Sequence, residues 1–252
     1  MYSVQAAAEI HYTIPQNHAI KRFTFCSERS KSNIFCSWSG GKDSTFALYK
    51  VIQTGNQPSY LLTMMIETGD RSRSHGIPKN VLQEQASCLG LPIRFCATSW
   101  QSYTENFRRE LHSFKEAALD IGIFGDIDVE GHLEWVQTVC RDEEVEAWLP
   151  LWHSDRAALI HDMLEAGFRI EIVVVKDGVL SENFLGRVLD KDLVKEFEAI
   201  GIDLCGENGE YHTIVTDGPI FHRPLNIQHG QRVLRDGYWF SDVSLEEDLT
   251  EI

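Results

Sequence analysis

The sequence predicts an α/β protein in which a parallel-sheet domain is followed by a smaller C-terminal mixed α/β domain. From residue 34 onward, apolar runs of strand length alternate with amphipathic segments of helix length, which is the pattern of βαβ units. The stretch 220–240 differs, because short β-type runs and the turn signals His229-Gly230 and Asp236-Gly237 favour an antiparallel element. A chain of 252 residues is long enough to bury the core of both parts.

The first elements follow one another closely along the chain. The apolar run 34–38 predicts a strand, and a helical pattern over 44–54 and a buried strand over 60–66 come next. Pro78 suits the first turn of a second helix, and Gly90 is placed to end that helix. Two complete βα units are therefore expected before residue 91.

The same alternation continues through the middle of the chain. A third strand is expected over 91–98, and an apolar stripe at intervals of three or four residues predicts an amphipathic helix over 103–121. Gly122 is expected to close this helix before a fourth strand begins at residue 123. The later expected elements are a helix at 131–145, a strand at 147–152, a helix at 155–166 capped by Ser154, and a strand at 168–175.

The charge balance argues against nucleic acid as the main partner. The chain carries 23 Lys and Arg against 38 Asp and Glu, a net charge of −15, which disfavours a broad contact with a phosphate backbone. The six cysteines form neither a CxxC pair nor a zinc-type spacing, so we interpret them as thiols in a reducing compartment. With no leader-like start and no run of about 18 apolar residues, a cytoplasmic protein away from membranes is expected.

The most informative segment is 39–44, Ser-Gly-Gly-Lys-Asp-Ser, between the first strand and the first helix. Gly40 and Gly41 have no Cβ atom, so the backbone can turn sharply and bring its N–H groups against an anion. The helix that follows directs the positive end of its dipole at the same point. A plain Gly-Ser turn is the weaker alternative, and we predict a phosphate-binding loop.

The side chains of this loop support the same interpretation. Lys42 adds a mobile positive charge, Ser39 and Ser44 offer hydroxyl donors, and Asp43 could hold a metal ion that accompanies the phosphates. The spacing fails the Walker A pattern GxxxxGK[ST], because Cys36 stands where the first glycine is required and Asp43 where Ser or Thr is required. The segment is therefore expected to be a different kind of phosphate loop.

A second candidate site lies at 203–213, which reads DLCGENGEYHT. Glu207, Glu210 and His212 are close together and are spaced by glycine. Such a group can bind a cation, orient a polar substrate or shuttle a proton, whereas a solvated turn is the alternative for this composition. By contrast, His132 with Glu134 does not form the HExxH pattern, and we interpret His132 as an ordinary surface or helix histidine.

The segment 39–44 resembles the PP-loop of the N-type ATP pyrophosphatases, which grip the pyrophosphate that leaves when ATP is split between its α and β phosphates. Together with GENGEYHT at 206–213, it is similar to the diphthine-ammonia ligase family and related ATP-pyrophosphatase-like proteins. Blocks that match in the same order are Arg73 with Ser74-His75-Gly76, Gln85-Ala86, Leu89-Gly90-Leu91-Pro92, Phe124-Gly125-Asp126-Ile127, Leu149-Pro150-Leu151-Trp152, Leu185-Gly186-Arg187 and Asp217-Gly218-Pro219-Ile220-Phe221.

The resemblance implies a domain organisation and a reaction. A HUP-type, Rossmann-like PP-loop ATP-binding domain is expected at 33–128, a substrate domain with the second motif at 129–252, and an N-terminal arm or extra strand at 1–32. ATP with Mg²⁺ would activate a small-molecule or protein carboxylate as an acyl-adenylate, and ammonia would displace AMP to leave an amide. No glutaminase module is evident in this sequence, so free ammonia or another amine is the expected nucleophile. A homodimer is left as an open alternative.

Carried over residue by residue, the resemblance also implies site roles. The ATP phosphates would contact Ser39, Gly40, Gly41, Lys42, Asp43 and Ser44, with Asp126 as a Mg²⁺ or ribose contact beside the metal candidate Asp43. The implied catalytic residues are Lys42, Asp43, Glu207, Glu210 and His212. The implied substrate contacts are Arg73, His75, Glu207, Asn208, Gly209, Glu210 and Tyr211.

Two positions depart from the pattern of the ligases that act on diphthine. There the second motif tends to read GEGGE with an acidic residue two positions on, whereas Asn208 and His212 occupy those places here. The adenylating half-reaction is therefore better supported than the diphthine substrate. Two other functions stay open: a non-catalytic adenine-nucleotide-binding regulatory module, and an RNA-modifying adenylating enzyme, against which the acidic charge and the missing CxxC pair both count.

Overall fold

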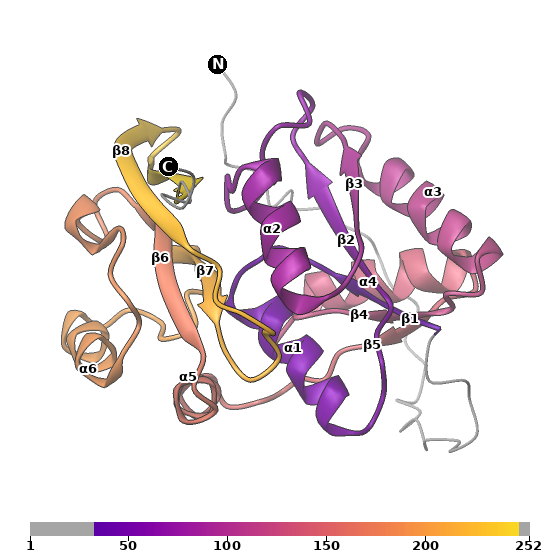
Figure 1. The fold of residues 1–252 in the computed structure, drawn as a ribbon, viewed down its shortest axis with the longest axis horizontal. Coiled ribbons are helices and arrows are strands. Elements are labelled where there is room, and N and C mark those ends of the chain that lie inside the picture. The colour runs from indigo at the N-terminus through magenta and orange to yellow at the C-terminus, as the bar shows by residue number, and fades with distance from the viewer. Residues whose placement is uncertain (1–32, 247–252) are drawn as a thin grey trace, which may run out of the picture.

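The computed structural model describes residues 33–246, so the arm or extra strand expected at 1–32 lies outside the described residues. Its first sheet is parallel and has the strand order β3-β2-β1-β4-β5 (Figure 1). The strands are β1 Ile34–Ser37, β2 Tyr60–Met65, β3 Ile93–Ala97, β4 Ile121–Ile123 and β5 Glu146–Trp148. The order reverses between β1 and β4, and ligands of open α/β sheets bind at the carboxyl ends beside such a reversal.

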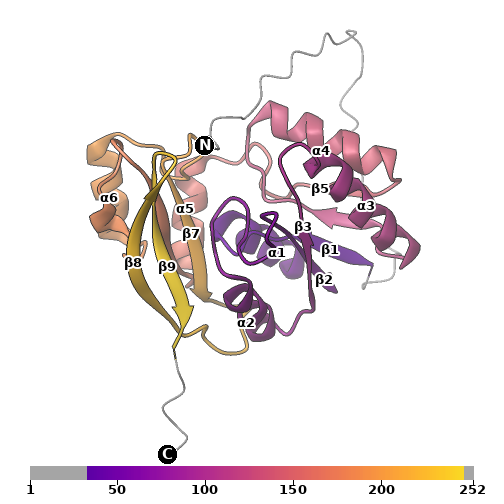
Figure 2. The ribbon, with the colours of Figure 1, turned by 90° about the horizontal axis from the view of Figure 1, so that it is seen from above.

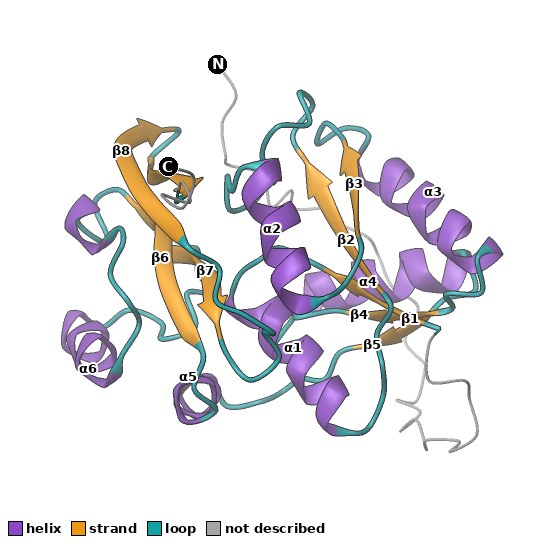
Figure 3. Cartoon of the chain, in the orientation of Figure 1, coloured by secondary structure: helices purple, strands orange, loops and turns teal. Residues whose placement is uncertain are grey.

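Helices cover both faces of this sheet, as Figures 2 and 3 show. They are α1 Lys42–Gln53, α2 Lys79–Leu89, α3 Tyr103–Glu116 and α4 Glu130–Asp142. Alternate residues of β1 serve the two faces, because Ile34 and Cys36 share a core with α1 and α2 whereas Phe35 packs with α3 and α4. Pro78 and the left-handed Gly90 bound α2, as the sequence predicts.

The second sheet is antiparallel and has the order β7-β6-β9-β8. Its strands are β6 Arg169–Lys176, β7 Tyr211–Asp217, β8 Ile227–Arg235 and β9 Tyr238–Leu245, with α5 Arg156–Glu165 before them and the 3₁₀ helix Glu182–Phe184 and α6 Lys191–Ile200 between β6 and β7. This sheet stands beside α1 and α2 (Figure 2), where α1 contacts β7 and α2 contacts β9. The expected mixed α/β class of both parts is confirmed.

Some local expectations were wrong. Asp236-Gly237 does join β8 to β9, but His229-Gly230 lies inside β8, where the ladder shifts register; a glycine is tolerated in such a bulge. Gly122 does not close a helix, because α3 ends at Glu116 and Gly122 sits in β4. A Cβ at Gly122 would lie 2.6 Å from the Phe35 ring, so close packing between strands requires the glycine.

Further differences concern helix ends and two unexpected elements. The cap of α5 is Asp155 and not Ser154, because the Asp155 side chain accepts the N–H of Ala158. Helix α6, which Asp190 caps and Gly201 ends, was not expected from the sequence, and β7 begins at Tyr211, inside the second motif. In the described part of the chain, no helix has the length and apolar composition that a membrane span needs.

The parallel sheet extends past residue 128, where the sequence predicts a domain boundary. Helix α4 and strand β5 follow that residue, and β5 pairs with β4 through Ile121↔Glu146 and Ile123↔Trp148. Both elements thus belong to the first sheet and its helical layer. We propose that the domain boundary falls between β5 and α5, so that the parallel-sheet domain is longer than expected.

Candidate active site

A cavity of about 350 Å³ lies where the carboxyl ends of β1, β2 and β4 face the start of β7. The expected site residues that line it are Ser39, Lys42, Asp43, Ser44, Arg73, His75, Asp126, Glu207, Gly209, Tyr211 and His212. Gly40, Gly41, Asn208 and Glu210 belong to the same two loops but are not part of the wall. Two motifs far apart in sequence therefore meet at one cleft.

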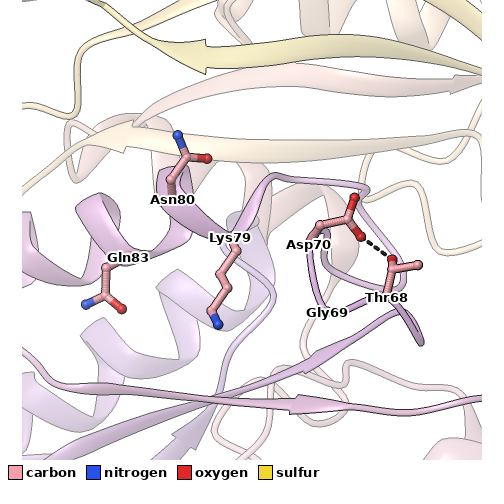
Figure 4. A pocket seen from close by; sticks show the side chains of 6 residues that line it. All are labelled: Thr68, Gly69, Asp70, Lys79, Asn80 and Gln83. Carbon is pink, nitrogen blue, oxygen red and sulfur yellow. Dashed lines mark hydrogen bonds between the residues drawn. The ribbon is translucent and has the colours of Figure 1, made fainter.

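Another pocket, of about 540 Å³, opens beside the start of α2 and is lined by Thr68, Gly69, Asp70, Lys79, Asn80 and Gln83 (Figure 4). It is larger, but it holds a single carboxylate, Asp70, and a single amine, Lys79. Asp70 accepts a hydrogen bond from Thr68, and the Lys79 amine lies 5.2 Å from the centre of the Phe95 ring. The smaller cavity, which gathers carboxylates, imidazoles and a lysine, is the better candidate for chemistry.

The loop 39–44 has the shape that the sequence predicts. It turns at Gly40, which has a φ of +82°, and a Cβ at Gly41 would lie 2.4 Å from Cε1 of His75. The hydroxyls of Ser39 and Ser44 are 3.0 Å apart, and Ser39 Oγ accepts the N–H of Gly41 at 3.2 Å. Both hydroxyls thus stand at the N-terminus of α1, where phosphate oxygens bind well.

A buried glutamine ties this loop to the second sheet. Gln85 in α2 has no exposed surface, and its Nε2 donates to the carbonyls of Gly40 at 2.9 Å and of Val215 at 2.7 Å. Its Oε1 accepts the indole N–H of Trp38 at 3.0 Å. The N–H of Val215 also donates directly to the Gly40 carbonyl at 3.0 Å. Because all the polar atoms of Gln85 are paired, the loop and β7 are held in one fixed relation.

Lys42 is a buried cation at the floor of the cleft. Its side chain is 4 % exposed, and its Nζ donates to both carboxylate oxygens of Asp43, at 2.9 and 2.8 Å. Burial lowers the pKa of Lys42, but the charge of Asp43, its hydrogen bonds to Lys42 and the neighbouring Tyr211 and Cys205 together hold that pKa above its usual value. The Lys42 backbone N–H donates to Thr213 Oγ1 at 3.0 Å, which joins the two motifs directly.

His75 and His212 face each other above Lys42, with ring centroids 4.7 Å apart. His75 Nδ1 lies 2.8 Å from the Thr213 carbonyl, so Nδ1 carries the proton and Nε2 is an acceptor. Burial lowers the pKa of both imidazoles, and the neighbouring His75 and Lys42 lower that of His212 further. Both rings are therefore neutral at pH 7 in the free protein.

Glu207 is the carboxyl whose protonation is most altered by the cleft. Burial and then repulsion by Asp43 raise its pKa to about 7, while Lys42 and Arg156 act in the opposite direction. Near neutral pH, both the acid and the carboxylate are populated. Such a group can accept and return a proton at the working pH of an enzyme.

Glu210, by contrast, is used inside its own loop. Its Oε1 accepts from the Asp203 N–H at 3.2 Å and from Asn208 Nδ2 at 3.1 Å, and its Oε2 accepts from the Asn208 N–H at 3.1 Å. The residue is 7 % exposed and does not line the cavity. Glu210 and Asn208 thus shape the turn that presents Glu207 and Gly209.

Asp126 and His132 line the same cavity as Glu207. His132 Nδ1 lies 3.2 Å from Asp126 Oδ1, and this hydrogen bond raises the pKa of His132. A Cβ at Gly125 would lie 2.8 Å from the Asp43 carbonyl carbon, so the glycine lets Asp126 approach the start of α1. His132 is an exposed residue of α4, as expected for a surface or helix histidine, and the structure also places it in the cavity wall, which the sequence did not predict.

Arg73 enters the cleft from the loop after β2. Its guanidinium lies 4.8 Å from the centre of the Trp100 ring and donates to the Thr98 carbonyl. Within residues 33–246, its buried Nε has no hydrogen-bond partner. Burial lowers the pKa of Arg73, yet it remains a cation. One donor of this cation is therefore available to an anionic ligand.

Asp43 and Asp126 suit a Mg²⁺ ion that is shared with phosphates. Among the described residues, no three or more His, Cys, Asp or Glu side chains are arranged to hold a metal ion. Mg²⁺ is usually bound by one or two carboxylates together with substrate phosphates and waters, and it prefers oxygen ligands. Asp43 and Asp126 therefore stay the predicted Mg²⁺ ligands, in an arrangement where phosphates and waters would complete the coordination.

Comparisons with known proteins identify the family of the chain. Family models for the diphthamide synthase N-terminal and C-terminal domains match residues 32–147 and 155–246. A diphthine–ammonia ligase of Danio rerio is 25% identical over 247 residues, 85% of this chain and 96% of that protein. One of Schizosaccharomyces pombe is 27% identical over 212 residues, 74% of this chain and 34% of that protein. A solved structure of a predicted tRNA methyltransferase subunit from Methanocaldococcus jannaschii has a TM-score of 0.41 at 15% identity, covering 74% of this chain and 97% of that one.

Proposed function

Because the chain belongs to the diphthamide synthase family, we propose that it adenylates a carboxylate with ATP and then amidates that carboxylate with ammonia. The expected family resemblance is confirmed by this membership, and so is the expected enzyme class, an ATP-dependent ligase. The relatives are named for diphthine and ammonia, and we propose diphthine or a similar carboxylate as the acyl substrate. The observation that carries the proposal is the meeting of 39–44 and 206–213 at one cavity.

In the first half-reaction, an oxygen of the carboxylate attacks the α-phosphorus of ATP, the α–β bridging bond breaks, and pyrophosphate leaves. The loop 39–44 binds the β and γ phosphates through its N–H groups and hydroxyls, and Lys42 stabilises the charge of the leaving group. Asp43 and Asp126 would hold Mg²⁺, which neutralises phosphate charge when it is bound. Arg73 offers its donor to the carboxylate or to the phosphates.

In the second half-reaction, the nitrogen of ammonia attacks the acyl carbon, the bond from that carbon to the AMP oxygen breaks, and AMP leaves. Ammonium must lose a proton before it can attack, and the nitrogen loses another after it has attacked. Glu207 is the group that we assign to this transfer, because its pKa of about 7 allows it to accept a proton near neutral pH. His75 and His212 present neutral imidazoles to the same space.

The site argues for chemistry over simple nucleotide binding. A regulatory module needs donors for phosphates, which the loop 39–44 supplies alone, but it has no need of a carboxyl held at a raised pKa beside Asp43. Burying such a group lowers the free energy of unfolding, and groups that destabilise the fold in this way are most common at catalytic sites. RNA modification has no specific support in the cleft, and the net charge of −15 opposes it.

Product analysis tests the proposal. The protein is incubated with ATP, Mg²⁺ and a diphthine substrate labelled with ¹⁸O in its carboxylate, with and without ammonium. Acyl-adenylate chemistry transfers one ¹⁸O atom to AMP, releases pyrophosphate and forms the amide only when ammonium is present. Release of ADP and phosphate would overturn the assignment, as would AMP without ¹⁸O in a reaction that forms amide.

A further inference from the structure

Arg156, the first residue of α5, joins two carboxylates, Asp128 and Asp203, from segments far apart in the sequence. Its Nε and Nη2 donate to the two oxygens of Asp128, and its Nη1 donates to Oδ2 of Asp203. Asp128 follows β4 of the parallel sheet, whereas Asp203 opens the loop that carries Glu207. A planar guanidinium suits this task, because its rigid fork can engage two carboxylates at once.

Asp203 passes the restraint from Arg156 to Glu207. Its Oδ2 accepts the Glu207 N–H at 2.9 Å, and its Oδ1 accepts the Cys205 N–H at 3.0 Å. The Cys205 thiol in turn donates to the Arg156 carbonyl at 3.2 Å. The Asp203 side chain is 9 % exposed, so these charge-assisted bonds are shielded from water. These hydrogen bonds connect the segment 203–207 to Arg156 at the start of α5.

We propose that Arg156 is a positioning residue that holds the 203–207 segment so that Glu207 stays opposite Lys42 and Asp43. This inference rests on the proposed function, since it assigns the network to the acyl-transfer step that uses Glu207. The ATP phosphates are bound by a different loop, which Gln85 and Thr213 hold without help from Arg156. Loss of Arg156 should therefore affect amide formation far more than nucleotide binding.

Electrostatics adds a second effect of the same residue. The charges that act on the Glu207 carboxyl come from Asp43 and Lys42 on α1, Arg156 on α5 and Asp203 in its own loop. Arg156 lowers the pKa of Glu207 and Asp203 raises it, so the ion pair between them limits the net change. The network thus fixes the place of Glu207 and moderates its proton affinity.

The test compares Arg156→Met with Arg108→Met. Arg108 in α3 also meets two carboxylates, Glu143 at 2.9 Å and Asp142 at 3.5 Å, but it packs against α4 and does not line the cleft. Arg156→Met should lower the rate of amide formation about 10²-fold, as misplaced reactive groups do, with the ATP dissociation constant changed less than about threefold. Arg108→Met should leave both near wild type.

Asp128→Asn provides a second variant in case Arg156→Met does not fold. This substitution weakens the hydrogen bonds between Arg156 and the first domain but keeps the residues Asp203 and Glu207 themselves unaltered. It should lower the rate of amide formation about tenfold at unchanged ATP affinity. The role assigned to Arg156 is wrong if turnover matches that of Arg108→Met. It is equally wrong if turnover and ATP affinity fall in the same proportion, because that is the behaviour of a general clamp between domains.

Hydrogen exchange separates this inference from the proposed function. If no carboxylate supports ATP cleavage by the wild-type protein, the proposed function fails, but the network can still be tested. The amides of Cys205 and Glu207 should then exchange at least tenfold faster in Arg156→Met, while amides of the loop 39–44 keep their wild-type rates. Unchanged exchange at Cys205 and Glu207 would show that Arg156 does not hold this segment.

Discussion

Two clusters of buried carboxylates and histidines differ sharply in how their polar atoms are paired. In the second sheet, Glu171 Oε2 lies 2.9 Å from Nε2 of His229, whose Nδ1 lies 2.8 Å from Ser241 Oγ. The other Glu171 oxygen accepts from Thr216 and Arg169, both at 2.9 Å. In the cleft, Glu207 lies near the like charge of Asp43, and the two imidazoles lie near the Lys42 cation.

The pKa directions of the two glutamates express this difference. Burial raises the pKa of Glu171, but the hydrogen bonds from His229 and Thr216, together with the charge and hydrogen bond of Arg169, outweigh burial, and the pKa falls below its usual value. Burial of Glu207 is reinforced by Asp43, and its pKa rises to about 7. The sheet cluster thus stabilises the fold, whereas the cleft keeps a carboxyl in a state that favours proton transfer.

The largest expected effect concerns the cation of the cleft. Lys42→Ala should remove a charge-assisted contact to the leaving pyrophosphate and cost about 2 to 4 kcal/mol of transition-state stabilisation. The measurement is the rate of AMP release. Lys50→Ala on the same helix is the matched control, because Lys50 pairs with Asp162 at the surface and its loss should leave the rate of AMP release unchanged. Wild-type rates in Lys42→Ala would reduce the role of Lys42 to packing.

The second prediction concerns the hydrogen-bonded cluster around Glu171 in the second sheet. Glu171→Gln should lower the free energy of unfolding by about 1 to 3 kcal/mol, because the amide keeps one acceptor oxygen where the carboxylate offers two to Arg169, Thr216 and His229. Urea unfolding measures the loss, and Glu196→Gln, in an exposed pair with Arg187, serves as the control. ATP cleavage should be unchanged. A loss of activity at wild-type stability would mean that the two clusters are coupled.

The third prediction uses pH to separate the two glutamates. The folded pKa of Glu171 is lowered, so its stabilisation is present above pH 4.5 and is lost as the pH falls through the folded pKa. The folded pKa of Glu207 is raised, so native protein binds more protons than unfolded protein between pH 4.5 and 7, and stability falls as the pH rises through that window. Below pH 4.5 this cost is absent.

Glu207→Gln should remove that cost. In metal-free and nucleotide-free buffer at pH 8, the variant should be more stable than wild type by about 1 to 2 kcal/mol, after allowance for the partial exposure of Glu207. At pH 4 the two proteins should unfold at the same urea concentration. A variant that is less stable than wild type at pH 8 would contradict the direction of the Glu207 pKa.

The sequence revealed the parts of the site whose chemistry is local. The loop 39–44 was predictable because its glycines, hydroxyls and lysine lie together before a helix, and the fold followed from the alternation of strands and helices. The partners were not predictable in this way. Gln85 contacts Gly40 and Val215, and Arg156 contacts Asp203, across long stretches of chain, so only the folded structure brings them together.

The last prediction concerns Glu207 and Glu210 of the second motif, whose roles the sequence alone could not distinguish. Which carboxylate faces the cavity depends on the turn at Gly206 and Gly209, with φ of +71° and +78°. Glu210→Gln places an amide against the Asn208 donors and should cost about 0.5 to 1 kcal/mol of stability. ATP affinity should not change, and the limb of the pH–rate profile that belongs to Glu207 should remain. If that limb disappears in Glu210→Gln and persists in Glu207→Gln, the titrating carboxyl is Glu210 and the roles of the two glutamates are reversed.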